Sequence, residues 1–452
     1  MEKYMNMNKT LILLFMICMF LSACAPPALE KISMATPLPP INPVKEAQTA
    51  TAQMKNEKET PTIKNTPTFL TTLIPTFTPT SIPSRWATKK PGEKIYLKRI
   101  KMFTLSVGWA VGLAQPGDFE PILRTLDGGK NWRDVTPASV KNGTRVAAYF
   151  ADADRAWVIY TFPQPPEATR YEQVVWRTRD GGATWTPSSP LDSQMAMESF
   201  SVRDIGFVDG KFGWTLAHLG VGMHHDYIAL YTSLDGGLNW DRVLDPSSGS
   251  FPMSCYKSGV TFIDNQNGWI SGSCGGVQLG YYLYRTTDGG KTWKLETIPS
   301  PAGYAGIFNQ VESVCWTEPP VFPSQREGVF LLGCRLSQTE TRAWLYRSTN
   351  GGLNWQPYPL PAPYGTFEFI SANQGWFLGS RTGDSAEGST IYLTVNGGQN
   401  WQIITTVNWT GQLSFVDSRN GWIVATAGDE TALVRSQDSG RSWQMMTPVL
   451  IQ

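Results

Sequence analysis

The residue types best suited to chemistry lie in one short stretch of the chain. All three histidines, His218, His224 and His225, fall within nine positions, and Asp226 adjoins them. Such a set could ligate a metal ion. Adjacent side chains on an extended strand point to opposite sides, however, so one ion could not easily collect both His224 and His225. We therefore expect hydrogen-bonding surface histidines, with no bound metal and no cofactor.

Carboxylates offer a second kind of chemistry, because hydrolysis of a glycosidic bond needs two of them poised across a cleft. Asp118, Glu172 and Asp384 are candidates, but they are scattered along the chain. Solvated loop charges are the more common role of such residues. The net charge of +1 gives no electrostatic case for binding nucleic acid.

A repeated box indicates the elements that must position these residues. It consists of Ser or Thr, any residue, Asp or Asn, a small residue, Gly, any residue, a polar residue and Trp. The seven copies run from Thr125 to Trp132, Thr178 to Trp185, Ser233 to Trp240, Thr286 to Trp293, Ser348 to Trp355, Thr394 to Trp401 and Ser436 to Trp443. Repeats at such spacings are typical of architectures built from one small sheet per unit.

A second signature precedes each box, in which Phe is followed by a polar turn and then by Gly-Trp. Its seven copies begin at Phe103, Phe150, Phe207, Phe262, Phe322, Phe369 and Phe415. Ala156 replaces the Gly once, and Val329 replaces the Trp once. Each unit therefore predicts a strand ending near Phe, a Gly-Trp strand, a third strand such as 282–285, and a fourth strand opening on the box Trp.

The box itself is typical of a tight corner. Its Asp can cap turn amides and its Gly can supply a positive φ, while its Trp can fill the wedge between neighbouring sheets. Seven four-stranded antiparallel sheets arranged radially make a seven-bladed β-propeller, because ring closure buries both faces of every sheet. We expect this all-β domain over 95–452, with the repeats in 97–448.

These motifs resemble the Asp-box, or bacterial neuraminidase repeat, superfamily. The paired signatures look most like the photosystem II stability/assembly factor family of seven-bladed propellers, and this resemblance covers 97–448. It implies a non-enzymatic assembly factor that holds a membrane-protein partner. Sialidases and some endoglucanases also carry Asp boxes, so a glycoside hydrolase is the alternative, although the sequence lacks the Arg-Ile-Pro motif of a sialidase-like site.

The N-terminus indicates where the propeller is located. Lysines flank an apolar run, 11–20, that is too short to span a bilayer and is typical of a signal peptide. Leu21, Ser22, Ala23 and Cys24 follow, and they resemble a bacterial lipobox. We predict a lipoprotein signal peptide over 1–23 and a lipid anchor at Cys24, which would tie an extracytoplasmic protein to the bacterial membrane. An ordinary cleaved signal is the alternative.

The segment after the anchor cannot build a core. Residues 25–94 contain 12 Pro and 13 Thr, so we expect a disordered linker over 24–94. The functional alternative for this segment is a stalk that spans the cell wall or carries glycans.

Four cysteines remain in the repeat region, and their positions follow the second signature. Cys255 and Cys315 each precede a signature Phe by seven residues, and Cys274 and Cys334 each follow the signature Gly by six. These offsets place each pair on adjacent antiparallel strands within bridging distance. We predict Cys255–Cys274 and Cys315–Cys334 disulfides, consistent with an oxidising exterior. A four-thiolate zinc site is disfavoured because the pairs fall in separate blades.

Function should favour the face that carries the longer, more varied connections, from second to third strand and from blade to blade. The candidate binding residues on this variable face are Asp118, Glu120, Arg170, Tyr171, Glu172, His224, His225, Asp226, Tyr304, Arg381 and Asp384. We predict a non-catalytic binding or assembly module for a protein or glycan at the cell surface. A structural cell-surface component is a further alternative.

Overall fold

The computed structural model describes residues 89–114, 118–140, 145–161, 173–194, 199–275, 280–310, 313–384 and 387–452. The predicted signal peptide, Cys24 and nearly all of the predicted linker lie outside the described residues, as do Arg170, Tyr171 and Glu172. Within the described part, no helix has the length and apolar character needed to cross a membrane.

Strands β1 to β28 form seven consecutive antiparallel sets of four, which we number as blades 1 to 7. Blades 1 to 3 comprise β1 (Leu97–Met102), β2 (Gly108–Gly112), β3 (Ile122–Thr125), β4 (Asn131–Asp134); β5 (Arg145–Phe150), β6 (Ala156–Thr161), β7 (Val175–Thr178), β8 (Thr186–Pro187); and β9 (Ser201–Phe207), β10 (Gly213–Gly222), β11 (His225–Ser233), β12 (Asp241–Leu244). Blades 4 and 5 comprise β13 (Tyr256–Phe262), β14 (Gly268–Ser273), β15 (Tyr282–Thr286), β16 (Lys294–Leu295); and β17 (Val314–Thr317), β18 (Gly328–Arg335), β19 (Thr341–Ser348), β20 (Gln356–Pro359). Blades 6 and 7 comprise β21 (Tyr364–Phe369), β22 (Gly375–Ser380), β23 (Ser389–Thr394), β24 (Gln402–Val407); and β25 (Thr410–Phe415), β26 (Gly421–Ala427), β27 (Glu430–Ser436), β28 (Gln444–Met446).

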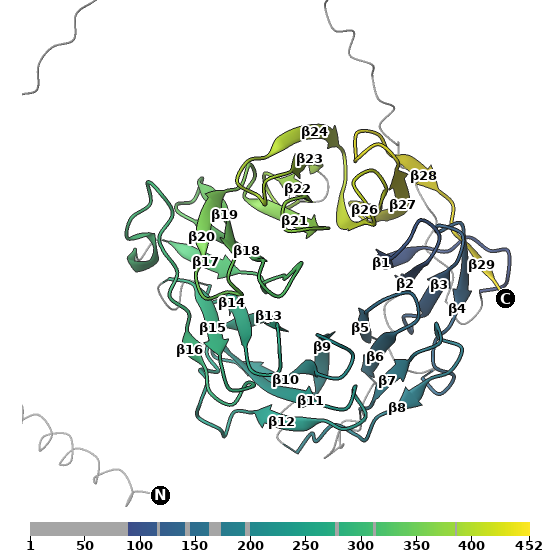
Figure 1. Ribbon diagram of the computed structural model, residues 1–452, viewed down its shortest axis with the longest axis horizontal. Helices are drawn as coiled ribbons and strands as arrows, with labels where there is room; N and C mark the ends of the chain where they lie inside the picture. Colours follow the sequence, from purple (N-terminus) through teal and green to yellow (C-terminus); the bar gives the residue numbers. More distant parts are fainter. Residues whose placement is uncertain are drawn as a thin grey trace, which may run out of the picture. The chain divides into compact units, whose positions relative to one another are not determined.

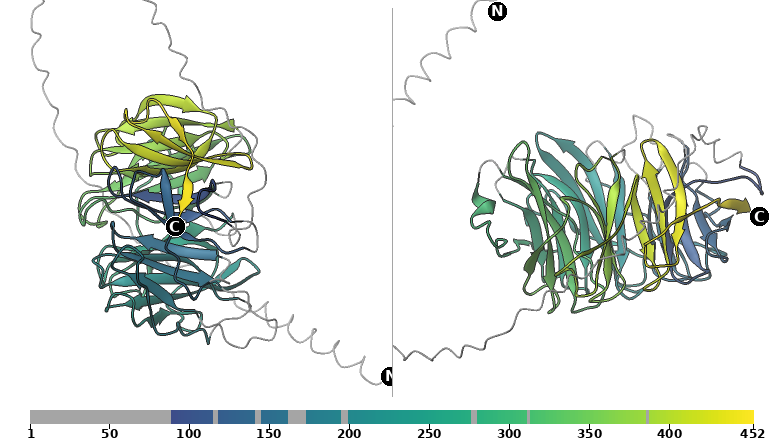
Figure 2. Two further views of the ribbon diagram at one scale, coloured as in Figure 1. Left: turned by 90° about the vertical axis from the view of Figure 1, so that its right-hand side faces the viewer. Right: turned by 90° about the horizontal axis from the view of Figure 1, so that it is seen from above.

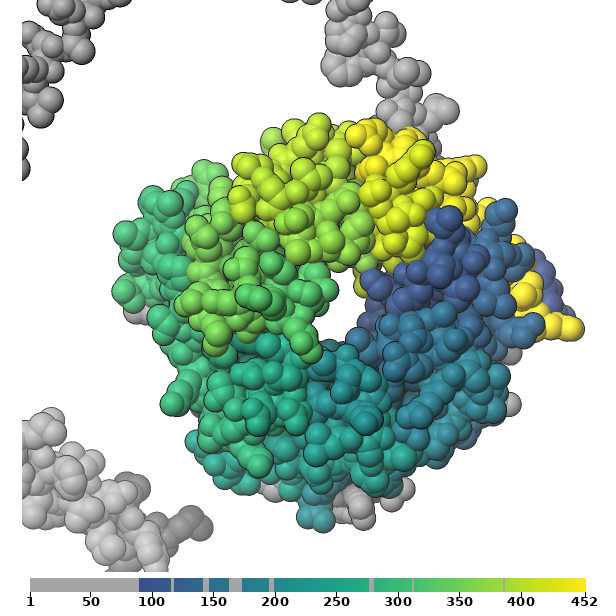
Figure 3. Space-filling model, viewed as in Figure 1, coloured from purple at the N-terminus to yellow at the C-terminus, as the bar shows by residue number. Residues whose placement is uncertain are grey.

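The blades stand around a central opening, and in blades 1 to 4 and in blade 6 the first strand lies innermost and the fourth at the rim (Figure 1). The space-filling view shows the opening from the same side (Figure 3). Blades 4 and 5 are linked into one eight-stranded sheet by a single pairing, Ser273 with Trp316. The predicted all-β propeller is therefore confirmed, and each blade keeps the predicted order of strands.

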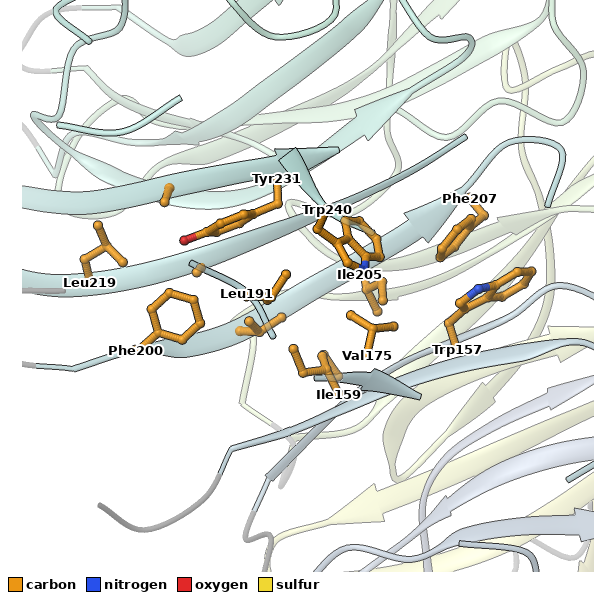
Figure 4. Close-up of a cluster of buried hydrophobic side chains, with 14 residues drawn as sticks. Trp157, Ile159, Val175, Leu191, Phe200, Ile205, Phe207, Leu219, Tyr231 and Trp240 are labelled. Carbon is orange, nitrogen blue, oxygen red and sulfur yellow. The ribbon is translucent and has the colours of Figure 1, made fainter. Parts of the chain in front are cut away.

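In blades 1 to 4 and in blade 6, the tryptophan of the second signature packs against the signature phenylalanine of the next blade. Ring centroids lie 5.4 Å apart for Trp109 and Phe150, 4.0 Å for Trp157 and Phe207, 5.5 Å for Trp214 and Phe262, 5.2 Å for Trp269 and Phe322, and 3.7 Å for Trp376 and Phe415. Figure 4 shows the second of these pairs within the core between blades 2 and 3. Stacking of this kind adds to the free energy of burial, so it fastens each sheet to its neighbour.

The boxes form the corners that the sequence predicts. Asp288 accepts the amides of Lys291 and Thr292 at 3.1 and 2.9 Å, and Thr286 Oγ1 accepts the Gly290 amide at 2.9 Å. Gly290 has a φ of 93°, which a residue with a Cβ rarely adopts. The box Trp293 donates its indole N–H to the Gly290 carbonyl and packs in the core shared by blades 3 and 4.

The innermost strands are edges, and side chains from neighbouring blades satisfy some of their backbone groups. Arg99 donates to the Ala148 carbonyl of blade 2 at 2.7 Å. Glu368 of blade 6 accepts the Phe415 amide of blade 7 at 2.6 Å and Lys101 Nζ of blade 1 at 2.7 Å. Burial raises the pKa of Glu368, while the nearby Lys101 opposes that shift. These carboxylate and guanidinium groups are thus committed to holding blades together.

Both ends of the domain take part in closing the ring. A further strand, β29 (Val449–Ile451), pairs in parallel with β4, and the Gly92 amide donates to the Leu450 carbonyl at 2.8 Å. Figure 2 shows β29, the yellow arrow at the C-terminus, against the blue strands of blade 1. β29 lies within the predicted domain, 95–452, and beyond the predicted repeats, which end at 448, whereas Gly92 lies in the predicted linker.

Adjacent positions of β29 provide a test of the closure. Leu450 is 7% exposed and packs in the core between blades 7 and 1, whereas Ile451 is 40% exposed. We predict that Leu450→Ala lowers the free energy of unfolding by about 2–5 kcal/mol, because it opens a cavity in that core. Ile451→Ala should cost less than about 1 kcal/mol. Denaturant unfolding of both variants measures the difference, and equal losses would contradict this role of β29.

Candidate functional site

The predicted binding residues that the structure describes do not meet at one site. Glu120 bonds Lys98 Nζ at 2.6 Å on blade 1, and the Tyr304 ring lies against Trp344, with centroids 5.0 Å apart, on blade 5. Arg381 and Asp384 belong to the connection between β22 and β23 on blade 6. His224, His225 and Asp226 are the predicted residues that the structure brings together.

The histidine stretch borders a groove of about 430 Å³ where blades 3 and 4 meet on the variable face. We call it the rim groove. Its lining residues are Val221, Gly222, Met223, His224, His225, Asp226, Cys255, Tyr256, Ser273, Cys274 and Gly275. Its wall is the long β10–β11 hairpin, and its floor comes from the start of β13 and the end of β14.

The hairpin turns through Met223 and His224, both in the left-handed region, with φ of 47° and 66°. Two-residue hairpin turns of this kind normally use Asn-Gly or similar pairs, because a Cβ is disfavoured there. Met223 is 93% exposed and Val221 is 66% exposed. The hairpin therefore presents large apolar side chains to solvent at the edge of the groove.

A disulfide fixes the floor of the rim groove. Cys255 and Cys274 are joined, with their sulfur atoms 2.09 Å apart, and Cys315 and Cys334 are joined on blade 5. Both predicted pairings are confirmed. Cys255 also donates its amide to the His224 carbonyl at 2.7 Å, so the floor and the hairpin turn are tied to each other.

The carboxylate of the groove, Asp226, is fully engaged. Its Oδ1 lies 2.8 Å from His218 Nδ1, and its Oδ2 accepts the Lys257 amide at 3.0 Å. Asp226 is buried, with only 2% of its surface exposed. Asp226 thus serves to join β10, β11 and β13 and is not presented to a ligand.

Lys257 lies beneath the groove in a cage of backbone carbonyls. Its Nζ donates to the carbonyl oxygens of Asp226, Met253, Ser254 and Cys255 at 2.8–3.0 Å. The rings of Phe251 and Tyr282 face the ammonium group at 5.6 and 5.5 Å. Burial lowers the pKa of Lys257 to about 7, and Asp226 opposes this shift.

Two expectations for the histidines were wrong. His218 is buried against Asp226 and is not a surface residue, because its partner comes from the facing strand of the same hairpin. His224 sits in the turn and not on an extended strand, so the argument that it must point away from His225 does not apply. Val221, Met223 and Tyr256 were not predicted as site residues. One sequence feature could have indicated Met223: it is an apolar residue next to two histidines, at a turn position where Gly or Asn is usual.

A second cavity, of about 360 Å³, lies on the opposite face between the boxes of blades 1 and 2. Its carboxylates include Asp127 and Asp180, which hold their own turns. The hydrogen bond from the Thr184 hydroxyl contributes most to lowering the pKa of Asp180 to about 2. Asp180 therefore stays ionised and holds its own turn, so it is not a proton donor in this cavity.

The comparisons with known proteins agree with this architecture. Residues 284–295 match the family model of the BNR/Asp-box repeat. The corner from Thr286 to Trp293 lies within this match. The chain is 25% identical over 209 residues to the xyloglucanase Xgh74A of Acetivibrio thermocellus, across 42% of this chain and 24% of that protein. The alignment thus spans about a quarter of the relative's length.

Solved structures match most of the chain at low identity. YCF48 from Cyanidioschyzon merolae is 17% identical, covers 77% of this chain and 97% of its own, and gives a TM-score of 0.41. The GH74 xyloglucanase from Xanthomonas campestris is 12% identical, with coverages of 79% and 80% and a TM-score of 0.33. The blade assignment rests on the strand pairing of this chain.

Substitution of the buried lysine tests how the groove is held. We predict that Lys257→Met lowers the free energy of unfolding by about 3–5 kcal/mol, because four buried carbonyls and Asp226 lose their cationic partner. Lys294→Met, at an exposed position of β16, is the matched control and should change stability by less than about 0.5 kcal/mol. Chemical denaturation measures both. If the two variants unfold alike, the carbonyl cage does not stabilise the floor of the groove.

Proposed function

We propose that this chain is a non-catalytic binding or assembly module outside the cytoplasm, and that the rim groove receives its partner. Two disulfides support an oxidising compartment, which is extracytoplasmic in most bacteria. The exposed Val221 and Met223 favour a protein partner, since apolar side chains of this size gain most by covering one another. The other class of ligand is a glycan that stacks on Tyr256, and the binding test below distinguishes it from a protein partner.

One observation carries the proposal: among the described residues that line the rim groove, Asp226 is the only carboxylate, and it is buried with both oxygens hydrogen-bonded. Acid–base hydrolysis needs two carboxylates that reach the substrate from opposite sides of a cleft. The groove instead combines a rigid disulfide floor with an apolar wall. Those features suit recognition, which gains from surfaces that are already ordered before contact.

A glycoside hydrolase is the second candidate, and the similarity to a xyloglucanase over 209 residues favours it. The two functions differ in what a purified protein does to xyloglucan. The binding module should release no reducing ends beyond the rate without protein. Turnover that is abolished by replacing one carboxylate, such as Asp118→Asn or Asp384→Asn, would establish the hydrolase instead.

A pair of matched valines tests the rim groove as the binding surface. Val221 is 66% exposed on its wall, and Val395 is 69% exposed in a box on the opposite face. We predict that Val221→Glu reduces capture of the partner from intact membranes at least about tenfold, because it places a charge on an apolar contact. Val395→Glu should leave capture unchanged.

Quantitative mass spectrometry of the captured material provides the measurement, and soluble cell-wall glycans added as competitors identify a glycan ligand. Unchanged capture by Val221→Glu, or equal loss from both variants, would contradict the assignment of the rim groove.

The lipid anchor at Cys24 is a further part of the proposal. The four-residue lipobox ending at Cys24 supports it. We predict that Cys24→Ser moves the protein from the membrane fraction to the soluble fraction and prevents lipoprotein-type processing, since the serine hydroxyl does not accept the diacylglyceryl group. Cell fractionation and intact mass measure both effects. Unchanged processing with retention in the membrane would overturn the anchor.

A further inference from the structure

The exposed tip of the β10–β11 hairpin holds three potential metal donors in consecutive positions. They are the thioether of Met223 and the imidazoles of His224 and His225, and all three residues line the rim groove. We propose that this turn binds a soft metal ion, Cu(I), which prefers thioether and imidazole ligands over carboxylates. Among the described residues, no cluster of three His, Cys, Asp or Glu side chains could hold a metal, so the methionine is essential to the site.

The backbone of the turn supports the proposal. Met223 and His224 both have positive φ, although neither is Gly, Asn or Asp. Each such residue costs about 1 kcal/mol or more relative to glycine, and strain of this kind concentrates at ligand sites. An Asn-Gly pair would form the same turn without strain. The turn formed by Met223 and His224 is therefore less stable than an Asn-Gly turn, and what it has instead is the two side chains.

The hydrogen bonding of His225 leaves one ring nitrogen for an ion. His225 Nδ1 lies 3.0 Å from the Met223 carbonyl oxygen, so Nδ1 carries the proton and donates it. The lone pair is then on Nε2. Histidines that bind metals commonly donate their other ring nitrogen to a backbone carbonyl in this way, which fixes both the tautomer and the orientation of the ring. Tyr227 stacks against the ring, with centroids 5.7 Å apart, and holds it further.

The surroundings of the turn also suit a cation. Among the described residues, neither lysine nor arginine lines the rim groove, and the Lys257 ammonium beneath it is enclosed by backbone carbonyls. The Met223 side chain is almost fully exposed, so its sulfur is accessible without any rearrangement of the core. Because His224 is in a turn, the alternation that separates neighbouring side chains on a strand does not keep its ring from the same ion as His225. The inference is independent of the proposed binding of a macromolecule.

The test uses silver(I) as a redox-inert substitute for Cu(I), because a reductant that maintains Cu(I) would attack the Cys255–Cys274 disulfide. The full chain is prepared with Cys18→Ser and Cys24→Ser, so that thiols outside the propeller do not compete. Silver affinity is measured by competition with a chelator. The key variant, Met223→Asn with His224→Gly, builds the favoured turn and removes two donors. Met445→Asn, at an exposed methionine on β28, is the matched control.

We expect the double variant to bind silver at least about 100-fold more weakly than the parent chain, since even indirect changes at metal sites cost 10–100-fold. Its thermal midpoint without metal should rise, because the turn loses strain. The control should keep the parent affinity. Silver affinities of the parent and the double variant within threefold of each other, or an equal loss in Met445→Asn, would overturn the site.

Discussion

The contact on which the rest of the molecule depends is the one between a Gly-Trp tryptophan and the phenylalanine of the following blade. A four-stranded sheet with strands of two to ten residues has little core of its own, so its faces must be covered by neighbours. The stacked pairs, such as Trp376 with Phe415 at 3.7 Å, provide this cover at the same place in successive blades. Blade 7 is joined to blade 1 by a hydrogen bond, in which Trp422 Nε1 donates to the Gly128 carbonyl at 3.0 Å.

Because of this contact, the two faces of the ring differ in what they carry. The face with the boxes carries the corners, the signature turns and the indole hydrogen bonds that cross between blades, as from Trp157 to the Gly236 carbonyl. The other face carries connections whose length does not affect the stacking. Blade 3 uses that freedom to extend the β10–β11 hairpin, and blade 4 braces it with the Cys255–Cys274 disulfide and the caged Lys257.

The sequence predicted the features that repeat. The boxes, the strand order, the seven units and both disulfides could be derived because each depends on residues at fixed short spacings, such as Cys315 seven positions before Phe322. Features that occur once could not be derived. β29 has no counterpart in the repeats, and the first strand of blade 5 ends at Thr317, ahead of Pro319 and Pro320, where the regular units continue to Phe. Proline lacks the amide that a strand ladder needs.

The candidate site was predicted only in part, for the same reason. The histidines marked the correct hairpin, but the burial of His218 depends on Asp226, whose second oxygen is held by Lys257 from another blade, 31 residues away. No local pattern predicts that contact. The left-handed conformation of Met223 and His224 was likewise hidden, since neither residue type favours it. The residues that line the rim groove are therefore set by tertiary structure more than by motif.

A double-mutant cycle on Trp157 and Phe207 tests the central claim most directly. The rings stack at 4.0 Å across blades 2 and 3. If this contact fastens the blades, replacing both residues by alanine should cost about 0.5–1.5 kcal/mol less than the sum of the single replacements. The same cycle on Trp157 and the distant Phe377 of blade 6 should be additive within about 0.5 kcal/mol. Additive losses for Trp157 and Phe207 would contradict the account.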